Sequence, residues 1–533
     1  KAADLMTAPI APTALSGTPA FRGWLAADGD VGNYANGYAT QWRAMTGSVA
    51  SSNMTSSDGK GFVSDPLGGP CMAGQFTSDG ASSGGNQVIL GSAQPSSNAF
   101  TLVIACNATA NPENTTGFEA GSSTTIRPTV FGLSSTAFDT GSTLAKVALC
   151  LNHLRQWCIR TTGATMGTHD YTSTGRASAS TQILVVTSGA GGLTIAVYAN
   201  GVSTTIYSGA ALAAKTLNLV GLGLDPFGTP GTTGWRGGIR GAVLVNSVLS
   251  GAQSAGLAQW MRDQVGDGMG DGTETKAVIF IGDSRFAGAY APGVRSVAGR
   301  AAEALAGRAV VATVGISSAT ADWWSTSHRV LDMCSLGEMF PGHTITNYTF
   351  VLDLGTNDAG ITGASETAVA DYATALASVV SDLESLDSTV KVIVCTPVPA
   401  ANAGGWGVAG ANASKASFGA GGTAGLLGYR TEIMATYPLV LDLASNDAWA
   451  CPDFESGWTD KQLANVTSSP PFNIAPTAST TAAGPNIWDQ THYGDRGTAL
   501  VVEQLLAFAP FRSRIYGAWA NRPLGTAITT RPF

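Results

Sequence analysis

The sequence predicts a multidomain chain with two fold classes, an all-β sandwich followed by an α/β domain with a doubly wound parallel sheet of five strands. Three observations support this. At 533 residues the chain is too long for one hydrophobic core, and 44% of its residues are hydrophobic. Up to about residue 266, strand-length apolar runs alternate with Gly/Ser/Thr-rich turns. From residue 275 onward, apolar strands alternate with helix-length segments, which indicates parallel strands joined by helical crossovers.

The β domain is expected at residues 21–266. An arm precedes it, residues 1–20, which is rich in Ala, Pro and Thr and has no core of its own. The clearest strand candidates of the β domain are residues 101–106, 144–151, 182–186, 193–199, 203–207, 217–222 and 239–245.

A hairpin and a terminal helix give this domain a characteristic order. Asn200-Gly201, between two strand candidates, predicts a tight hairpin. Residues 249–261 predict an amphipathic helix that closes the domain. This order resembles the concanavalin A-like, laminin-G-like jelly-roll sandwich. The resemblance implies either a glycan-binding domain or a spacer, because a fold alone does not determine a function.

Residues 267–274 predict a Gly-rich linker. Asp and Gly alternate there as in a calcium loop, but the flanking helices and a Glu at the twelfth loop position are missing. The α/β domain is expected at residues 275–511, with a C-terminal tail at residues 512–533. Residues 404–428 and 470–485 predict loops. The strand candidates are residues 277–281, 309–314, 349–354, 392–395 and 439–443, and the helix candidates are residues 295–306, 366–386 and 496–508.

Composition limits the partners and the location. Only 12% of the residues are charged, so small polar residues must supply much of the surface, as in β-rich extracellular, carbohydrate-facing and virion proteins. The net charge of −8 and the lack of a basic patch argue against a nucleic-acid partner. No apolar run reaches the roughly 18 residues of a membrane helix. Without a signal-peptide core at its start, the chain is expected to be extracellular or virion-associated, with a signal removed or another route out of the cell.

The seven cysteines are odd in number and widely spaced. Cys106, Cys150 and Cys395 lie within apolar strand candidates, which favours buried thiols over a disulfide framework. Cys150 and Cys158 can face each other across a hairpin. No metal site is expected, because the sequence contains no CxxC or HxxxH spacing.

A serine stands where the first strand of the α/β domain ends. The apolar run 277–281 predicts a strand that is buried on both faces, and Gly282-Asp283-Ser284 follows it directly. Ligands of open parallel sheets bind outside the carboxyl ends of the strands. A turn at Gly282 therefore places Ser284 where a nucleophile is needed.

A serine hydroxyl needs a base, which is usually a histidine oriented by a carboxylate. Among the five histidines only His492 comes with its own candidate orienting acid, Asp489, which stands three residues before it in a segment that leads into the last helix. Taken alone, this spacing is more typical of a simple helix cap. The other four histidines lie in loops or between strands: His153, His169, His328 and His343.

Acyl transfer also needs donors for the developing oxyanion. Asn357, in the segment 355–358 after the third strand, can offer its side-chain amide, although Gly and Asn are also plain turn formers. After the second strand, the segment 315–320 can offer backbone N–H groups. Together with the serine and the histidine, these pieces occur at successive strand or helix ends of one domain.

Three of these segments resemble the blocks of the SGNH (GDSL-like) hydrolase family. They are residues 282–284, 355–358 and 489–492, which match the first, third and fifth blocks in the family order over about residues 275–510. The resemblance implies a flavodoxin-like sheet and a serine esterase that needs no metal or organic cofactor. The implied roles are nucleophile for Ser284, base for His492, orienting acid for Asp489, and oxyanion donors for the Ser284 N–H and the Asn357 side chain.

The second block departs from the family pattern. Where the family commonly has a glycine that donates its N–H to the oxyanion, this chain has Ser318, and Gly315 three residues earlier is the alternative donor. A backbone donor survives the change to serine if the local φ permits it. Asp353, in an otherwise apolar strand, is expected to be a structural acid.

The resemblance and the composition together favour a deacetylase of acetylated polysaccharide, with a cell-surface glycan as partner. Loop tryptophans near the blocks can stack on sugar rings, although loop packing explains each of them as well. These are Trp323, Trp324, Trp406 and Trp488.

Two other functions remain open. A glycan-binding adhesin or virion spike with a weak or inactive hydrolase domain fits the missing signal peptide, the unpaired cysteines and the altered second block. The N-terminal arm would then attach it to a virus-like particle or help to form a homo-oligomer. A lipase-like esterase would need a broad apolar acyl pocket, which the Gly/Ala/Thr-rich loops do not indicate.

Overall fold

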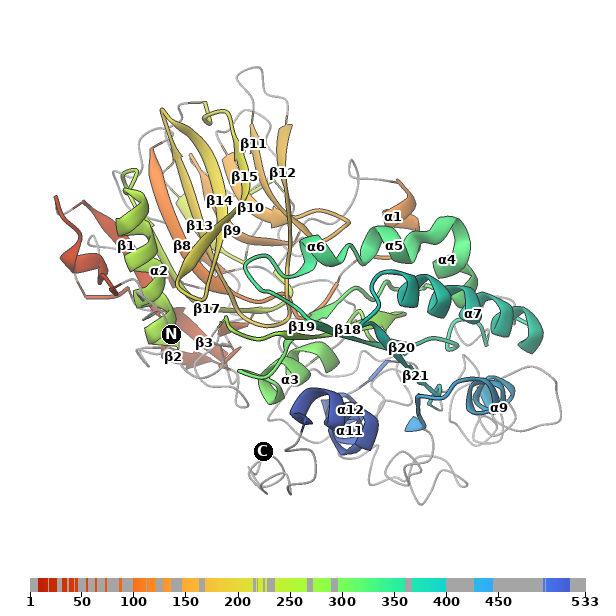
Figure 1. Ribbon diagram of the computed structural model, residues 1–533. Coiled ribbons are helices and arrows are strands. Elements are labelled where there is room, and N and C mark those ends of the chain that lie inside the picture. The colour runs from red at the N-terminus through yellow and green to blue at the C-terminus, as the bar shows by residue number, and fades with distance from the viewer. Residues whose placement is uncertain are drawn as a thin grey trace.

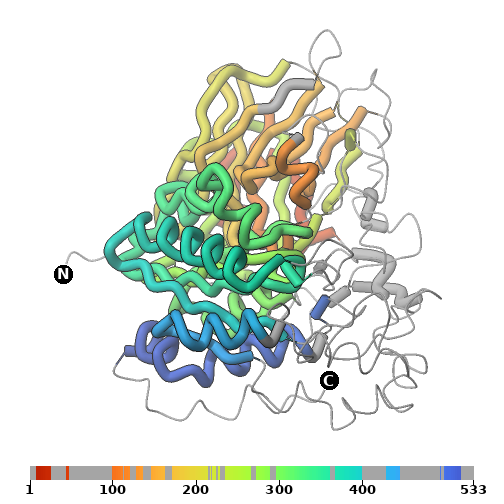
Figure 2. Tube along the Cα trace, turned by 90° about the vertical axis from the view of Figure 1, so that its right-hand side faces the viewer, coloured from red at the N-terminus to blue at the C-terminus, as the bar shows by residue number. Residues whose placement is uncertain are grey.

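The structure is a computed structural model in which the two domains pack against each other (Figures 1 and 2). It describes residues 8–17, 19–25, 31–35, 38–42, 44–46, 54–55, 63–64, 72–73, 86–88, 99–111, 113–120, 128–135, 146–162, 168–213, 217, 219–223, 226–227, 235–265, 272–288, 296–359, 367–398, 426–443, 492–493 and 495–517. The predicted loop 470–485 and most of the predicted linker and of the loop 404–428 lie outside these residues.

The N-terminal domain consists of two antiparallel sheets packed face to face. The first has the order β15-β14-β13-β8-β17-β6-β5, with β1 also paired to β17, and the second has the order β12-β11-β10-β9-β16-β7. The first sheet contains β1 (Phe21–Leu25), β5 (Val63–Ser64), β6 (Met72–Ala73), β8 (Phe100–Cys106), β13 (Gln182–Gly189), β14 (Gly192–Ala199), β15 (Val202–Gly209) and β17 (Gly238–Val245). The second contains β7 (Asn86–Val88), β9 (Thr129–Ser134), β10 (Lys146–Leu151), β11 (Gln156–Thr162), β12 (Thr168–Arg176) and β16 (Leu219–Leu222). A small third sheet contains β2 (Val31–Ala35), β3 (Tyr38–Trp42) and β4 (Met54–Thr55).

Strand β8 shows why this domain carries continuous apolar runs. Leu102 and Ile104 point into the core between the two sheets, whereas Val103 and Ala105 point to the other face, which helix α2 (Gly251–Val265) covers. Both faces of the strand are therefore buried, and its sequence does not alternate between apolar and polar residues. The expected sandwich and its closing helix are confirmed, while the jelly-roll resemblance stays a prediction.

Two local predictions about the β domain hold. Asn200 and Gly201 adopt left-handed φ values of +49° and +76°, as a tight hairpin between β14 and β15 requires. Cys150 and Cys158 are direct register partners on β10 and β11, and both are buried thiols.

The described part of the expected arm is packed rather than free. The Ile10 N–H donates to the Gly256 carbonyl of α2 at 2.8 Å, and Leu15 is 2% exposed in the core beneath that helix. A Cβ on Gly256 would lie 2.5 Å from the Ile10 side chain, so the glycine lets the arm lie close to the helix.

The C-terminal domain has the expected parallel sheet of five strands, in the order β19-β18-β20-β21-β22. In chain order this is 2-1-3-4-5, the flavodoxin-like arrangement, so the crevice between β18 and β20 is the position where such sheets bind ligands. The strands are β18 (Lys276–Gly282), β19 (Val310–Thr313), β20 (Asn347–Asp353), β21 (Lys391–Cys395) and β22 (Val440–Leu441).

Helices cover both faces of this sheet (Figure 1). Ala277, Ile279 and Ile281 of β18 face one layer, and Val278 and Phe280 face the other. The first layer contains α4 (Ala321–Ser325), η4 (Thr326–His328), α5 (Arg329–Met333), α6 (Leu336–Met339), α7 (Val369–Ser385) and α9 (Leu426–Thr436). The second contains α3 (Val297–Ala304), α11 (Asp495–Ala507) and α12 (Ala509–Tyr516).

Helix α12 corrects the predicted tail. It begins with Pro510 in its first turn and continues to Tyr516, and its residues Phe511 and Ile515 are buried under the sheet. The Ile515 carbonyl accepts a hydrogen bond from Lys276 Nζ at 2.6 Å. The α/β domain therefore extends beyond residue 511, because a proline at the start of a helix is compatible with helical geometry.

The sandwich covers the outer edge of the parallel sheet. The Ala179 N–H and the Ser178 hydroxyl both donate to the carbonyl of Val311 on β19, at 2.8 and 2.7 Å, and the Val311 N–H donates to Ser180 Oγ at 2.9 Å. An edge strand otherwise exposes unpaired backbone groups. The two domains thus share an ordered polar interface. In the described part of the chain, no helix is both long and apolar enough to cross a membrane.

Candidate active site

Ser284 and His492 come together although 208 residues separate them in the chain, with Ser284 Oγ and His492 Nε2 2.9 Å apart. Ser284 stands two residues after the end of β18 and is 6% exposed. His492 lies just before α11, which begins at Asp495. This is the distance at which an imidazole can remove the hydroxyl proton, provided that the ring proton is on Nδ1.

The residues before the serine shape its turn. A Cβ on Gly282 would lie 2.2 Å from the Asp353 carbonyl oxygen on β20, so only glycine fits there. The Asp283 carboxylate accepts the Arg285 N–H at 2.9 Å and closes the turn. The Gly282 carbonyl accepts the indole N–H of Trp324 at 3.1 Å. Contacts of Gly282 with Asp353 on β20 and with Trp324 therefore fix the turn that positions Ser284.

A buried ionic group lies behind the serine. Asp283, Arg285 and Asp353 are each no more than 2% exposed. Burial raises the pKa of Asp283, and the positive charge of Arg285 opposes this rise. Burial, and then the charge of Asp283, raise the pKa of Asp353 to about 7. The Tyr493 hydroxyl donates to Asp353 Oδ2 at 2.8 Å. Asp353 thus has the structural role expected of it, since it anchors the residue next to His492.

Ser318 has the backbone geometry of a glycine. Its φ is +66°, in the left-handed region, which costs a non-glycine residue about 1 kcal/mol. Among the described residues, none accepts a hydrogen bond from its N–H. Gly315 differs, because its N–H points to Thr313 Oγ1 at 3.4 Å and a Cβ on it would lie 2.4 Å from the Ala287 nitrogen. The geometry favours Ser318 over Gly315 as the backbone donor.

Asn357 is tied to the loop that carries Ser318. Its Nδ2 donates to the Ala319 carbonyl at 3.0 Å, which uses one of the two hydrogens of the amide. Gly355, at a φ of +118°, makes the sharp turn that directs the chain there from β20. The Asp358 carboxylate accepts the Ala321 N–H at the start of α4 at 3.0 Å. The segments after β19 and β20 thus form one hydrogen-bonded unit.

Asp358 makes stability depend on pH. It is 1% exposed, and burial raises its pKa from 3.8 to about 7. The folded state holds this proton more tightly than the unfolded state, so the stabilisation is complete below about pH 4 and is lost as the pH rises through 7. Asp358→Asn keeps an acceptor for the Ala321 N–H but cannot ionise. We expect the stability of this variant, relative to the native protein, to increase between pH 4 and 7.

Urea unfolding of both proteins at several pH values between 4 and 7.5 measures this difference. Curves of unfolding free energy against pH that run parallel for the two proteins would contradict it.

Two histidines that were expected to lack a carboxylate have one. His328 Nδ1 lies 2.8 Å from Asp382 Oδ2, and His343 Nδ1 lies 3.7 Å from Glu274 Oε2. The expectation that only His492 has an acidic neighbour is therefore wrong, because neighbours in space need not be neighbours in sequence. The feature that sets His492 apart is the serine at its Nε2.

The stacking prediction is wrong for the two tryptophans that the structure describes. Trp324 is fully buried. Trp323 is 9% exposed, packs edge-on against Phe118 and donates its indole N–H to Glu119 at 2.8 Å. Both rings are used in packing. Trp406, Trp488 and the expected orienting acid Asp489 lie outside the described residues.

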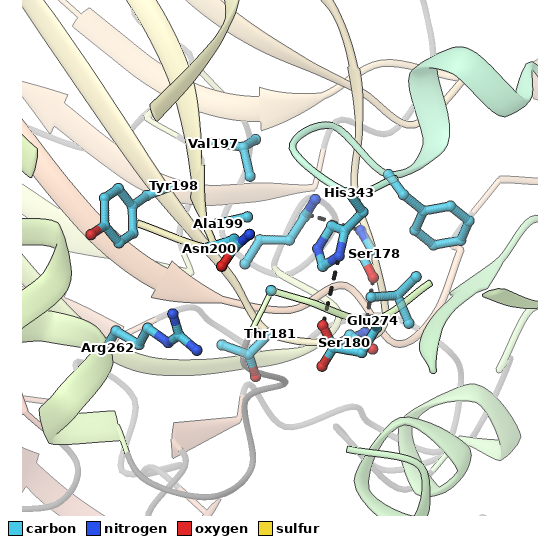
Figure 3. Close-up of a pocket in the computed structure, with 14 residues that line it drawn as sticks. Ser178, Ser180, Thr181, Val197, Tyr198, Ala199, Asn200, Arg262, Glu274 and His343 are labelled. Carbon is cyan, nitrogen blue, oxygen red and sulfur yellow. Dashed lines mark hydrogen bonds and ion pairs between the residues drawn. The ribbon is translucent and has the colours of Figure 1, made fainter. Parts of the chain in front are cut away.

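A separate small cavity, lined by both polar and apolar side chains, lies between the domains (Figure 3). His343 and Glu274 face each other in it, with Ser178 and Asn200 from the sandwich and Arg262 from α2 around them. Its volume of about 30 Å³ suits one or two water molecules rather than a sugar ring. It is a feature of the interface and contains neither Ser284 nor His492.

Two contributors to the site escaped sequence reasoning. Tyr493 follows His492 directly, and its partner Asp353 is an acid at the end of a buried strand, a position that could have suggested a polar partner. Asn111 of the sandwich also contacts the site, through Ala287 and Gly315. Nothing in the sequence connects Asn111 to residues so far along the chain.

Comparison with known proteins assigns no family. No protein-family model and no curated protein matches the chain. Among solved structures, Trypanosoma rangeli sialidase in complex with 2,3-difluoro-KDN is similar with a TM-score of 0.32 and 15% identity, over 49% of this chain and 37% of that one. Domain 4 of AbnA, a GH43 extracellular arabinanase from Geobacillus stearothermophilus, in complex with arabinotriose, gives 0.29 and 16%, over 45% and 99%. The CBM40 of Ruminococcus gnavus IT-sialidase bound to α2,6 sialyllactose gives 0.23 and 14%, over 31% and 85%.

The chain thus spans little more than a third of the sialidase. At TM-scores this low, the likeness carries no argument about fold or function. The proposals below rest on the geometry of the site and on the sequence motifs.

Proposed function

We propose that the chain is a serine esterase of SGNH type that removes acetyl groups from an acetylated polysaccharide. The observation that carries the proposal is the 2.9 Å contact between Ser284 Oγ and His492 Nε2 at the carboxyl ends of a parallel sheet. Donors for an oxyanion also lie on the neighbouring strand ends, the Ser318 N–H after β19 and the Asn357 amide after β20. The proposal thus assigns an oxyanion donor to the strand on each side of the serine strand.

In the first half of the reaction, Ser284 Oγ attacks the ester carbonyl carbon while His492 Nε2 takes the hydroxyl proton. The carbonyl oxygen becomes an oxyanion, which the N–H groups of Ser284 and Ser318 and the Asn357 amide stabilise. The intermediate collapses, the bond to the sugar oxygen breaks, and His492 returns the proton to that oxygen. The products of this half are a free sugar hydroxyl and an acetylated Ser284.

In the second half, water replaces the sugar. His492 takes a proton from the water, whose oxygen attacks the acetyl carbon and forms a second oxyanion in the same site. The bond to Ser284 Oγ breaks, the serine recovers its proton from His492, and acetate leaves. The imidazolium that forms twice needs a carboxylate at Nδ1, and Asp489 is the residue proposed to supply it.

The choice of substrate follows from the surface composition and the motifs. With 12% charged residues, the chain has a surface suited to neutral, hydroxyl-rich partners. Small and polar residues dominate the segments 315–320 and 355–360 that flank the nucleophile, which favours a small acyl group over a fatty one. The preceding sandwich is then a platform that presents the polysaccharide or a spacer that carries the enzyme.

The test is acetate release from acetylated polysaccharides, measured beside hydrolysis of p-nitrophenyl acetate and p-nitrophenyl octanoate, with Ser284→Ala as control. We expect acetate release by the native protein only, and faster hydrolysis of the short ester. Preference for octanoate would indicate a lipase-like esterase. No release from any ester by folded native protein would overturn the proposal and leave a glycan-binding spike or adhesin as the better account.

A further inference from the structure

We infer that the sandwich domain holds the oxyanion hole of the α/β domain in place, with Asn111 as the positioning residue. This inference rests on the proposed esterase function. The sandwich contributes residues 107–111 and 113–120, which follow strand β8 and end in the short helix α1 (Thr115–Ala120). This segment, named the brace here, lies against the two loops that carry Ser284 and Ser318.

Asn111 connects the two loops directly. Its backbone N–H donates to the Ala287 carbonyl, in the turn that begins at Ser284, at 2.7 Å. Its side-chain Nδ2 donates to the Gly315 carbonyl, in the loop that leads to Ser318, at 3.1 Å. Asn111 is 4% exposed, so water does not compete for these bonds. One residue of the sandwich thus sets the spacing between the nucleophile turn and the oxyanion loop.

The brace also fixes the residue that precedes Ser318. The Ser317 N–H donates to the Glu113 carbonyl at 3.0 Å, and the Ser317 carbonyl accepts the Thr115 N–H at 3.1 Å. Both backbone groups of Ser317 are therefore bound by the other domain, in a short parallel bridge with Asn114. On the other side of Ser318, Ala319 is held by Asn357.

This arrangement accounts for the left-handed backbone of Ser318. A non-glycine residue keeps a φ of +66° only where its surroundings impose it. The bonds to Ser317 and Ala319 impose it from both sides. A glycine would adopt this conformation without help, so a chain with serine at this position depends on the brace more than one with glycine.

The brace is itself rigid. The Arg155 guanidinium donates to the carbonyls of Ala108 and Ala110, each at 2.9 Å, and Arg155 is 2% exposed. The Asn107 side chain accepts the Gly238 N–H at 2.6 Å and donates to the Ala179 carbonyl at 2.9 Å. These bonds fix the brace to the sandwich core. The sandwich, and not only the α/β domain, therefore determines the position of the loop that carries Ser318.

Asn111→Asp isolates the bond that matters. Aspartate keeps the shape of the side chain and the oxygen that accepts the Glu113 N–H at 3.2 Å, but it replaces the donor that faces the Gly315 carbonyl. Ser178→Ala is the matched control. It removes another buried hydrogen bond between the domains, from the Ser178 hydroxyl to the Val311 carbonyl at 2.7 Å, away from both loops.

The experiment measures kcat and KM for p-nitrophenyl acetate and the thermal midpoint for native protein, Asn111→Asp, Asn111→Ala and Ser178→Ala. Misplacing one oxyanion donor is expected to lower kcat by about 10- to 100-fold in both Asn111 variants, with KM changed less than about threefold. Ser178→Ala is expected to lose thermal stability and to keep kcat. A third readout is inhibition by a boronic acid, whose tetrahedral adduct needs the oxyanion hole. Its binding should weaken in parallel with kcat.

The outcomes are distinct. If the native protein is inactive, the proposed function fails and the inference fails with it. If the native protein is active and folded Asn111→Asp keeps its kcat, the inference is wrong and the function stands. If kcat falls in Ser178→Ala as much as in the Asn111 variants, following the thermal midpoint, Asn111 is merely structural and the inference is overturned.

Discussion

Replacing Ser284 with alanine is expected to lower kcat/KM for acetyl ester hydrolysis by about a thousandfold or more. The variant loses the Ser284 Oγ atom, which lies 2.9 Å from His492 Nε2 and forms the acyl-enzyme in the proposed mechanism. The fold should survive, because the turn depends on Gly282 against Asp353 and on the Asp283 carboxylate, neither of which changes. Steady-state kinetics beside a thermal melt measure both effects.

A result that contradicts this account is a folded Ser284→Ala protein with turnover within tenfold of the native enzyme. The matched control is Ser317→Ala, which changes a serine hydroxyl in the neighbouring loop and leaves its backbone hydrogen bonds to the brace in place. It is expected to stay within about threefold of native activity, since the half-buried Ser317 side chain has no role in the proposed chemistry.

Asn357→Ala is expected to lower kcat by about 100- to 1,000-fold, as is typical when one oxyanion donor is lost. Because the amide interacts with charge that develops only in the transition state, KM should change little. Part of the loss of kcat is expected to be structural. Asn357 Nδ2 donates to the Ala319 carbonyl, so the alanine variant also loses a hydrogen bond that holds the loop of Ser318.

Asn357→Asp distinguishes the loss of the amide donor, to the oxyanion and to the Ala319 carbonyl, from a simple loss of side-chain volume. It preserves the shape of the side chain but places an acceptor, and at neutral pH a negative charge, where the donor stood. Its kcat should be at least as low as that of Asn357→Ala. A folded Asn357→Asp enzyme with kcat within threefold of native would exclude the side chain from the oxyanion hole.

The parallel sheet was predictable because burial on both faces leaves a plain signal. The run 277–281 carries no polar residue, and the structure places alternate members of it in two separate cores. The helices between residues 321 and 339 were not predictable, because each is only three to five residues long and too short for a helical period. Helix α12 was missed because Pro510 reads as a helix end, although it stands in the first turn of a new helix.

The serine and the histidine were predictable because both belong to motifs that keep their order along the chain. The family resemblance singled out Ser318 as a residue in the place of a glycine, and its φ of +66° lies in the left-handed region that favours glycine. Other contacts of the site had no local signal. The buried Trp324 donates its indole N–H to the Gly282 carbonyl, and Asn111 donates to the Gly315 carbonyl across 204 residues. The first pair forms when the α/β domain folds, and the second forms only when the two domains pack together.

Covalent labelling tests the central claim most directly. The native protein is treated with a fluorophosphonate, which reacts with an activated serine and stops at a tetrahedral adduct in the oxyanion hole. The account predicts one adduct by intact mass, located by peptide mass spectrometry on Ser284, and slow or absent labelling in His492→Ala. No adduct on folded protein, or an adduct on another residue with Ser284 unmodified, would contradict it.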